Sequence, residues 1–326
     1  MTEDDARRHR RALAVRVLQS VVIGAAVVFL WSLARTHRAD LSRVPLELRA
    51  LPLVAATLAW FAAFGALVAN WAASLAWWKQ RITTVAALRI FFLSNLARYV
   101  PGAIWQFAGL AAMSSAKGVA PSAATAAVLV QQATLLVTGL GLAIALAPAY
   151  LAPLAAAIGL PVPGLAARVA IAFAGIGLAV VVAPRVLEPL RRLAARWVPE
   201  AALVPELTPR RFARYALVTL GGWLLYGAAF ALFARAVLGD AAPPPFLGGA
   251  TYIAAYVAGI IWIFVPGGLG IREGALVVGL APSLGYDRAL FLAISSRIWL
   301  VALEILGALF FLRAVPDAGR AAPPGR

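Results

Sequence analysis

Residues 264–274 read FVPGGLGIREG, and residues 98–106 read RYVPGAIWQ. Each stretch lies near the middle of an apolar run, 247–281 or 82–116, of about 35 residues, which is too long for a single bilayer crossing. Proline removes a backbone donor and glycine leaves the helical conformation easily, so each run is predicted to form two half-helices joined by a turn. If each pair of half-helices enters the membrane and returns to the same side, each run is a re-entrant hairpin.

Six other apolar runs have a length suited to one membrane crossing, about 20 residues at about 1.5 Å per residue. Isolated strands would leave backbone groups without partners in lipid, and the runs lack the alternation of a membrane barrel. The sequence therefore predicts an all-α, polytopic membrane protein with about six full spans and two broken hairpins. The predicted spans are 13–34, 51–78, 121–147, 165–183, 212–238 and 287–313.

The composition excludes several classes of soluble protein. The chain is 63% hydrophobic and only 13% charged, which is not the composition of an ordinary globular enzyme. Its formal charge of +16 comes from basic residues placed between apolar runs, so it indicates membrane topology and not nucleic-acid binding. The chain has no Cys, and its two His flank the first apolar run, so we expect no metal site and no cofactor.

The basic residues also predict the orientation of the chain. Arginines within 7–16 and 185–214 are expected in the cytoplasm. Counting from a cytoplasmic N-terminus, 185–214 returns to the cytoplasm only if 82–116 does not cross, and both termini are then cytoplasmic. A cleaved signal peptide is the alternative for the first run, which is about twice as long as a usual signal core. Four arginines of the first external loop depart from the rule: Arg35, Arg38, Arg43 and Arg49.

The chain is expected to contain two membrane halves. Residues 184–211 of the second half are predicted to form a cytoplasmic loop with a short amphipathic helix on the inner leaflet or, alternatively, a solvated connector. In order, the predicted parts are a basic cytoplasmic N-terminus at 1–12, a first membrane half at 13–147 with the hairpin 82–116, a second membrane half at 165–313 with the hairpin 247–281, and a disordered tail at 314–326.

The two halves show a weak internal repeat. A shift of 165 residues places YVPG at 99–102 on FVPG at 264–267, and Gly109 on Gly274. Each half then holds two spans, a hairpin and a third span, and three crossings oblige the second half to begin on the opposite side. The pattern predicts an inverted repeat, which is typical of transporters. The alternative is that two apolar helical bundles align by chance.

Several polar side chains are predicted to lie near the middle of the membrane, where an ionisable group is costly unless it is paired or hydrated. If the second half-helix of each hairpin begins at its Pro-Gly break, its unpaired amides and positive dipole end point toward the centre and favour an anion. Arginine adds donors that match phosphate. The alternative is that Arg272–Glu273 and Arg297–Glu304 are structural pairs. The candidate binding residues are Arg98, Pro101, Gly102, Gln106, Gln131, Gln132, Pro266, Gly267, Gly268, Arg272, Glu273, Arg297 and Glu304.

The motifs RYVPG with Trp105-Gln106, and PGGLGIREG at 266–274, resemble those of the lysylphosphatidylglycerol synthase transmembrane-region family. That family includes the flippase half of the bacterial multiple peptide resistance factor and the membrane part of some archaeal glycosylation proteins. The resemblance covers nearly the whole chain and implies a flippase-like domain for lipids with a modified or glycosylated head group. Relatives often have an acidic–basic pair where this chain has Gln131-Gln132, and a lysine at Ala103. This sequence shows no aminoacyl-transferase domain, so the resemblance does not imply synthesis of lysyl-lipid.

Together, these patterns predict a lipid translocase, and not an enzyme, that moves an anionic phospholipid or a polyprenyl-phosphate-linked sugar across the bacterial inner membrane. The expected partners are a membrane lipid with an anionic head group and, as a second candidate, a separately encoded lipid-modifying enzyme. One alternative is a non-transporting scaffold for such a synthase. Another is an intramembrane glycosyl or aminoacyl transferase, for which only Glu273 and Glu304 offer an acid or base at depth.

Overall fold

The computed structural model describes residues 28, 31–32, 35–36, 44–97, 105–194, 208–262, 268 and 270–313, and the secondary structure within these ranges is entirely helical. The predicted all-α membrane fold is therefore confirmed. Five helices in these ranges coincide with five of the six predicted spans, and the sixth, 13–34, lies mostly outside the described residues. The five helices long and apolar enough to cross a membrane are Ala50–Trp78, Pro121–Leu146, Leu165–Val182, Pro209–Ala241 and Tyr286–Leu312.

Several of the long helices begin at residues suited to a helix start. Pro121 and Pro209 occupy the first helical positions of α6 and α9, where a missing N–H costs nothing. The Thr208 hydroxyl accepts a hydrogen bond from the Arg211 N–H and caps α9. The long helices are α3 (Ala50–Ser74, extended by η1, Leu75–Trp78), α6 (Pro121–Leu146), α8 (Leu165–Ala194), α9 (Pro209–Leu238) and α12 (Tyr286–Arg313), and the short connecting ones are η3 (Pro148–Tyr150), α7 (Ala152–Ala157) and η5 (Gly239–Ala241).

Each of the two broken apolar runs forms a pair of short helices that pack on each other. The first pair is α4 (Thr84–Leu96) and α5 (Trp105–Ser115), and the second is α10 (Pro245–Ile261) and α11 (Ile271–Leu284). Their lengths of 13, 11, 17 and 14 residues are below the roughly 20 residues that cross a bilayer. The connecting residues 98–104, 263–267 and 269 lie outside the described residues.

The start of α11 differs from the sequence prediction. The second half-helix was expected to begin at Pro266-Gly267, but α11 begins at Ile271. Gly270 precedes it with φ of 77°, a left-handed conformation that glycine adopts without strain. The Glu273 carboxylate accepts a 2.7 Å hydrogen bond from the Gly270 N–H. This interaction fixes the first turn of the helix several residues after the proline.

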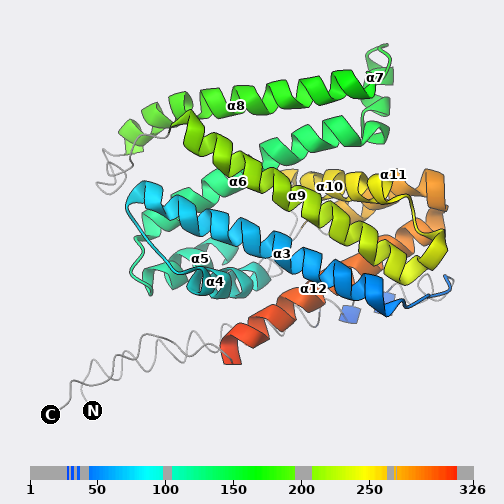
Figure 1. The fold of residues 1–326 in the computed structure, drawn as a ribbon, viewed down its shortest axis with the longest axis horizontal. Helices are drawn as coiled ribbons and strands as arrows, with labels where there is room; N and C mark the ends of the chain where they lie inside the picture. The colour runs from blue at the N-terminus through cyan, green and yellow to red at the C-terminus, as the bar shows by residue number, and fades with distance from the viewer. Residues whose placement is uncertain are drawn as a thin grey trace.

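Helices α3 and α9 lie side by side through the middle of the molecule, as Figure 1 shows, and they form its largest helix–helix contact. The contact is close because Gly222 of α9 faces the side chain of Leu67, where an added Cβ would come within 2.8 Å of a Leu67 methyl carbon. The half-helix pairs pack around these two central helices, α4 against α3 and α10 against α9.

Helix α8 lies on the outside of the bundle, packed mainly against α6 (Figure 1). Only 6% of its membrane-crossing segment, Leu165–Val182, is buried inside the protein. The helix continues without interruption from Leu165 to Ala194, so residues 184–194 extend the predicted span and do not form a separate amphipathic helix. The rest of the predicted loop, 195–207, lies outside the described residues.

The 165-residue shift that aligns the two Pro-Gly motifs also aligns the helices. It carries α3, α4, α5 and α6 onto α9, α10, α11 and α12, and it places Pro121, the first residue of α6, on Tyr286, the first residue of α12. The packing follows the same correspondence, because α4 packs against α12 as its counterpart α10 packs against α6.

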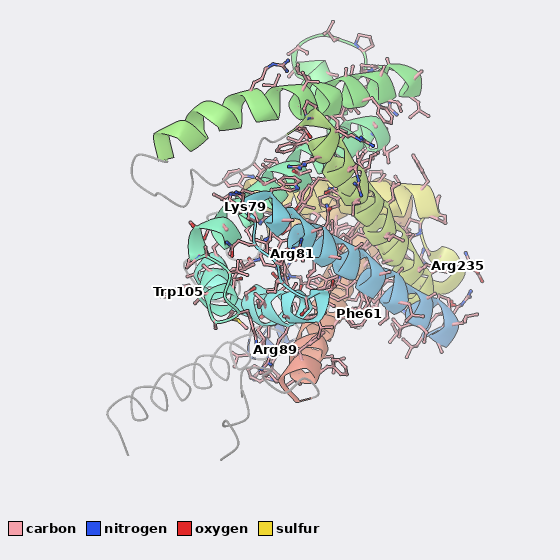
Figure 2. The ribbon with its side chains drawn as sticks, turned by 60° about the vertical axis from the view of Figure 1, so that its left-hand side comes forward. Phe61, Lys79, Arg81, Arg89, Trp105 and Arg235 are labelled. Carbon is pink, nitrogen blue, oxygen red and sulfur yellow. The ribbon has the colours of Figure 1, made fainter. Side chains whose placement is uncertain are left out.

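An ion-pair cluster joins the segment before α3 to the end of α9. The Arg49 guanidinium lies 2.8 Å from the Glu47 carboxylate and 2.9 Å from that of Asp240, and Arg235 lies 3.3 Å from Asp240. Figure 2 shows Arg235 at this end of the molecule and Arg81 near the other end of α3. Arg49 is one of the arginines that depart from the positive-inside pattern.

Candidate functional site

A cavity of about 310 Å³ lies between the two half-helix pairs and the helices that support them. Its lining comes from α3, α4, α5, α6, α9, α10 and α12, with Gly268 and the first turn of α11. The volume is at the lower end of the range of about 300–1,000 Å³ found for small-molecule sites. The predicted binding residues that line it are Gln106, Gln131, Gln132, Gly268, Arg272, Arg297 and Glu304.

Arg272, in the first turn of α11, is held against two tyrosine rings of α10. The guanidinium carbon lies 4.6 Å from the ring centroid of Tyr252 and 4.6 Å from that of Tyr256. The two tyrosines are four residues apart and therefore share one face of α10. Arg272 is 6% exposed, so these cation–π contacts occur away from bulk water, where they are strongest.

Two glycines let α10 and the turn before α11 approach each other closely enough for this contact. Gly268 has φ of 67°, and a Cβ on it would lie 3.0 Å from the Cα of Gly259. A Cβ on Gly259 would lie 3.6 Å from the Cβ of Arg272. The backbone crossing at these glycines places Arg272 beside α10.

Glu273 does not line the cavity but fixes residues that do. One carboxylate oxygen accepts the Gly270 N–H, and the other lies 3.7 Å from Nε of Arg297 on α12. The side chains of Arg297 and Glu273 are 3% and 13% exposed. The structure thus pairs Arg297 with Glu273 across two helices, a pairing that was not weighed from the sequence. Glu273 also supplies a negative charge to the α11 N-terminus, which was expected to be open to a ligand anion.

Carboxamide side chains form one side of the cavity. The Nε2 atom of Gln106 donates a 2.8 Å hydrogen bond to Oδ1 of Asn95, which joins α5 to α4. The Nε2 atom of Gln131 donates to the backbone carbonyl of Leu67 on α3 at 3.1 Å. Gln132 lines the same cavity one residue further along α6, and Glu304, 3% exposed, lines it from α12.

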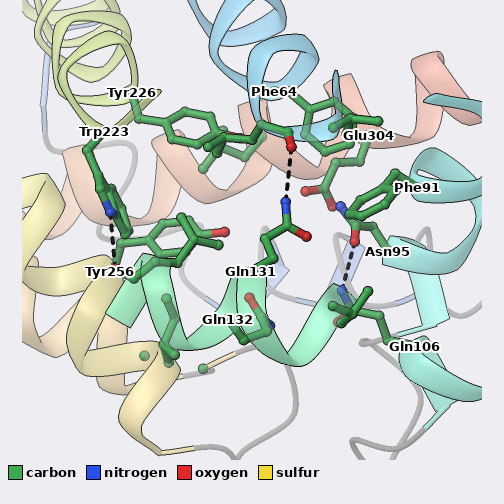
Figure 3. A pocket seen from close by; sticks show the side chains of 18 of the residues that line it. Phe64, Phe91, Asn95, Gln106, Gln131, Gln132, Trp223, Tyr226, Tyr256 and Glu304 are labelled. Carbon is green, nitrogen blue, oxygen red and sulfur yellow. Dashed lines mark hydrogen bonds between the residues drawn. The ribbon is translucent and has the colours of Figure 1, made fainter. Parts of the chain in front are cut away.

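Three aromatic side chains of α9 and α10 lie across the cavity from Asn95 and Gln106 (Figure 3). Figure 3 shows Trp223, Tyr226 and Tyr256 on one side of the cavity and Asn95, Gln106 and Glu304 on the other, with Gln131 between them. The rings of Tyr226 and Tyr256 stack at 6.2 Å with an interplanar angle of 14°, and Trp223 meets Tyr256 edge-on at 5.2 Å. Nε1 of Trp223 donates to the Thr138 hydroxyl at 3.2 Å, which fixes the indole.

These aromatic residues were missed in the sequence analysis because aromatic residues in apolar helices are usually core residues. The spacing of Tyr252 and Tyr256, four residues apart on the half-helix before the break, was a signal that could have placed two rings on one face. Five predicted site residues lie outside the described residues: Arg98, Pro101, Gly102, Pro266 and Gly267. Among the residues that the structure describes, no group of three or more His, Cys, Asp or Glu side chains is placed to hold a metal ion.

The apolar helices define a polytopic, α-helical membrane protein, and a cavity with several polar side chains lies between its helices. The profile of the family described as "Lysylphosphatidylglycerol synthase TM region" matches residues 16–310, and the chain belongs to this family. Membership indicates a function connected with membrane lipids. No curated protein and no solved structure gives a significant match to the chain.

Proposed function

We propose that the protein is a lipid translocase that moves a lipid with an anionic head group across the bacterial inner membrane without changing it chemically. The observation that carries this proposal is the position of Arg272, a buried cation that lines a cavity between two pairs of half-helices. A buried arginine in a membrane protein marks a ligand site by default, because its cost in lipid is high. Its planar fork of donors matches a phosphate.

The repeated arrangement of helices supports an alternating mechanism. The 165-residue shift relates α3–α6 to α9–α12, and an odd number of crossings in each half would give the two halves opposite directions. In that arrangement, the two half-helix pairs are re-entrant hairpins that enter from opposite sides and meet at the cavity. Inverted repeats with broken helices at a central site are the architecture of secondary transporters. The head group would then be reachable from either side in turn while the lipid tails stay in the membrane.

Two other functions would also use a lipid site. A membrane scaffold for a separate lipid-modifying enzyme would have little need for four half-helices around a cavity, because broken helices are tolerated in membranes only where they are buried or line a cavity. An intramembrane transferase would need an acid or a base. Of the two glutamates considered for that role, Glu273 is engaged with Gly270 and Arg297, and only Glu304 lines the cavity.

The test is reconstitution of the purified protein in liposomes with candidate phospholipids and polyprenyl-phosphate sugars. The assay measures head-group accessibility across the bilayer and the mass of the recovered lipid. Accessibility that changes at constant mass supports the translocase, and an altered mass supports the enzyme. A lipid that binds but is neither moved nor altered would leave the scaffold as the better account.

Variants of Arg272 connect the activity to the site. Arg272→Ala is expected to abolish transport while leaving the protein inserted, and Arg272→Lys to restore it only in part, because the bidentate fork is lost. Arg81→Ala removes an exposed arginine outside the cavity and serves as the matched control (Figure 2). Full transport by Arg272→Ala would show that this arginine has a structural role.

A further inference from the structure

Four ionisable side chains of the described residues lie in or beside the cavity. In the described residues, Arg272 and Arg297 carry the positive charges, and Glu273 and Glu304 carry the negative ones. Glu273 already serves Arg297 and the start of α11. The described lining itself contains two arginines and one carboxylate, Glu304, so its net charge is positive and favours a lipid phosphate over a positively charged head group.

Four carboxamide side chains also line the cavity: Asn95, Gln106, Gln131 and Gln132. Each carboxamide offers both donors and an acceptor, as a hydroxyl group does, whereas an ammonium group can only donate. The hydrogen bond between Asn95 and Gln106 uses Oδ1 of Asn95 and one proton of Gln106, so Nδ2 of Asn95 and Oε1 of Gln106 are not used by it. The bond from Gln131 to the Leu67 carbonyl likewise does not use Oε1 of Gln131. This mixed set of donors and acceptors is complementary to several hydroxyl groups.

The aromatic side of the cavity adds flat apolar surface opposite these amides. Tyr226, Tyr256 and Trp223 lie across the cavity from Asn95 and Gln106 (Figure 3). A sugar or polyol has C–H groups as well as hydroxyls, and it can pack the former on an aromatic ring while the latter bind amides. Tyr256 also contacts Arg272, so the phosphate position and the aromatic surface adjoin.

We infer that the ligand of this cavity is a lipid phosphate that carries an uncharged, hydroxyl-rich head group, with the phosphate at Arg272 and the hydroxyls at the carboxamides. This inference rests on the proposed lipid site and specifies its substrate class. It separates the ligand from aminoacylated lipids, whose head groups bear ammonium groups. Two kinds of lipid have the required chemistry: a phosphatidyl polyol and a polyprenyl-phosphate monosaccharide.

The test compares matched lipids for binding to the purified full chain in nanodiscs. One pair is phosphatidylglycerol and its lysyl ester, which differ by an amine-bearing group. The other is a polyprenyl phosphate with and without one hexose. We expect phosphatidylglycerol to bind about tenfold more tightly than its lysyl ester, and the hexose to strengthen binding about fivefold or more, as one or two added hydrogen bonds would. Whichever of phosphatidylglycerol and the hexose lipid binds with the higher affinity identifies the kind of lipid that the cavity accepts.

Replacing a carboxamide by a carboxylate tests whether charge in the cavity determines the lipid preference. Gln132→Glu adds a carboxylate to the lining and is expected to reduce or reverse the preference for phosphatidylglycerol over its lysyl ester. Gln80→Glu makes the same change outside the cavity, and it keeps the oxygen that accepts the Ala120 N–H, so the preference should stay as in the wild type. An equal effect of both variants would show a general effect of charge and would contradict a specific role of the cavity.

The outcomes for this inference and for transport are separable. A wild-type preference for the lysyl ester, or equal binding of all four lipids, overturns the inference even if lipid is moved in liposomes. A preference for hydroxyl-rich lipids without any change in their accessibility supports the inference and rejects the translocase.

Discussion

Arg272 depends on two rings of another helix for its position. Tyr252 and Tyr256 each lie 4.6 Å from its guanidinium carbon, and all three side chains line the cavity. Because the rings replace water around a buried cation, their loss should leave Arg272 less well fixed and more costly to bury. The tyrosine rings are therefore positioning groups for the proposed phosphate site.

Tyr256→Leu is expected to weaken binding of a phosphate lipid by up to about 30-fold, since a desolvated cation–π contact contributes up to about 2 kcal/mol. Tyr256→Phe keeps the ring and should retain most of the affinity. Lipid titration of the purified variants measures both. Equal affinities for the Leu and Phe variants would show that the ring does not hold Arg272 in place.

Glu273 is the second residue whose role the structure defines. Glu273→Ala should lower the free energy of unfolding by about 3–5 kcal/mol, because it removes a carboxylate beside a buried arginine together with the cap of α11. Glu273→Gln keeps an oxygen for the Gly270 N–H and should cost less. Thermal unfolding in detergent shows which of the two variants is less stable.

The matched control for Glu273→Ala is Glu47→Ala, which removes a carboxylate that is half exposed in an ion pair with Arg49. Its effect should be small because exposed ion pairs contribute little. A larger loss for Glu47→Ala than for Glu273→Ala would contradict this ranking.

At the scale of elements, the contact of α9 with α10 depends on glycine. A Cβ on Gly227 would lie 3.2 Å from the carbonyl oxygen of Gly249, and a Cβ on Gly249 would lie 3.1 Å from that of Gly227. Backbone atoms inside a packed helix pair cannot move aside as the end of a flexible side chain can. The two helices therefore touch at their backbones, as small residues permit in membranes.

Gly227→Ala is expected to destabilise the protein by about 1–3 kcal/mol through overpacking. Gly221→Ala on the same helix is the control, because its Cβ would meet nothing within 4 Å, and the better helix propensity of alanine should leave stability unchanged or raise it. Melting temperatures in one detergent compare the two. Equal stability of both variants would show that α9 and α10 can separate at little cost.

Most of the helices could be predicted from the sequence, but the arrangement of the cavity residues could be predicted only in part. Hydropathy and the two Pro-Gly breaks are local signals, so the spans and the four half-helices could be predicted. The start of α11 was missed because Gly270 and Glu273, several residues after Pro266, determine it. The pair of Arg297 with Glu273 was missed for a different reason. This pair depends on how α11 packs on α12, and the spacing of residues within one helix does not determine the packing of two helices.

The orientation of the whole molecule in the membrane remains a prediction with a direct test. The chain has no native Cys, so Lys117→Cys and Ala242→Cys can be labelled on intact cells with an impermeant thiol reagent. With a cytoplasmic N-terminus and a first hairpin that does not cross, only the cysteine at position 242 should react. Reaction of the cysteine at position 117 would contradict the prediction that residues 82–116 return to the side on which they enter.

The backbone contact at Gly227 and Gly249 also makes the α9–α10 pair mechanically different from the α3–α4 pair. The residues that precede these glycines by 165 positions are Ala62 and Thr84, so α4 has no glycine pair against α3 at the corresponding place. Helices α9 and α10 should therefore move as one rigid body, while α4 retains freedom to tilt on α3. Spin labels on cysteines at Val85 and Leu217 should report a broad distance distribution, and labels at Phe246 and Leu217 a narrow one. If lipid crosses by a rocking motion, we expect α4 to move while α10 stays fixed on α9.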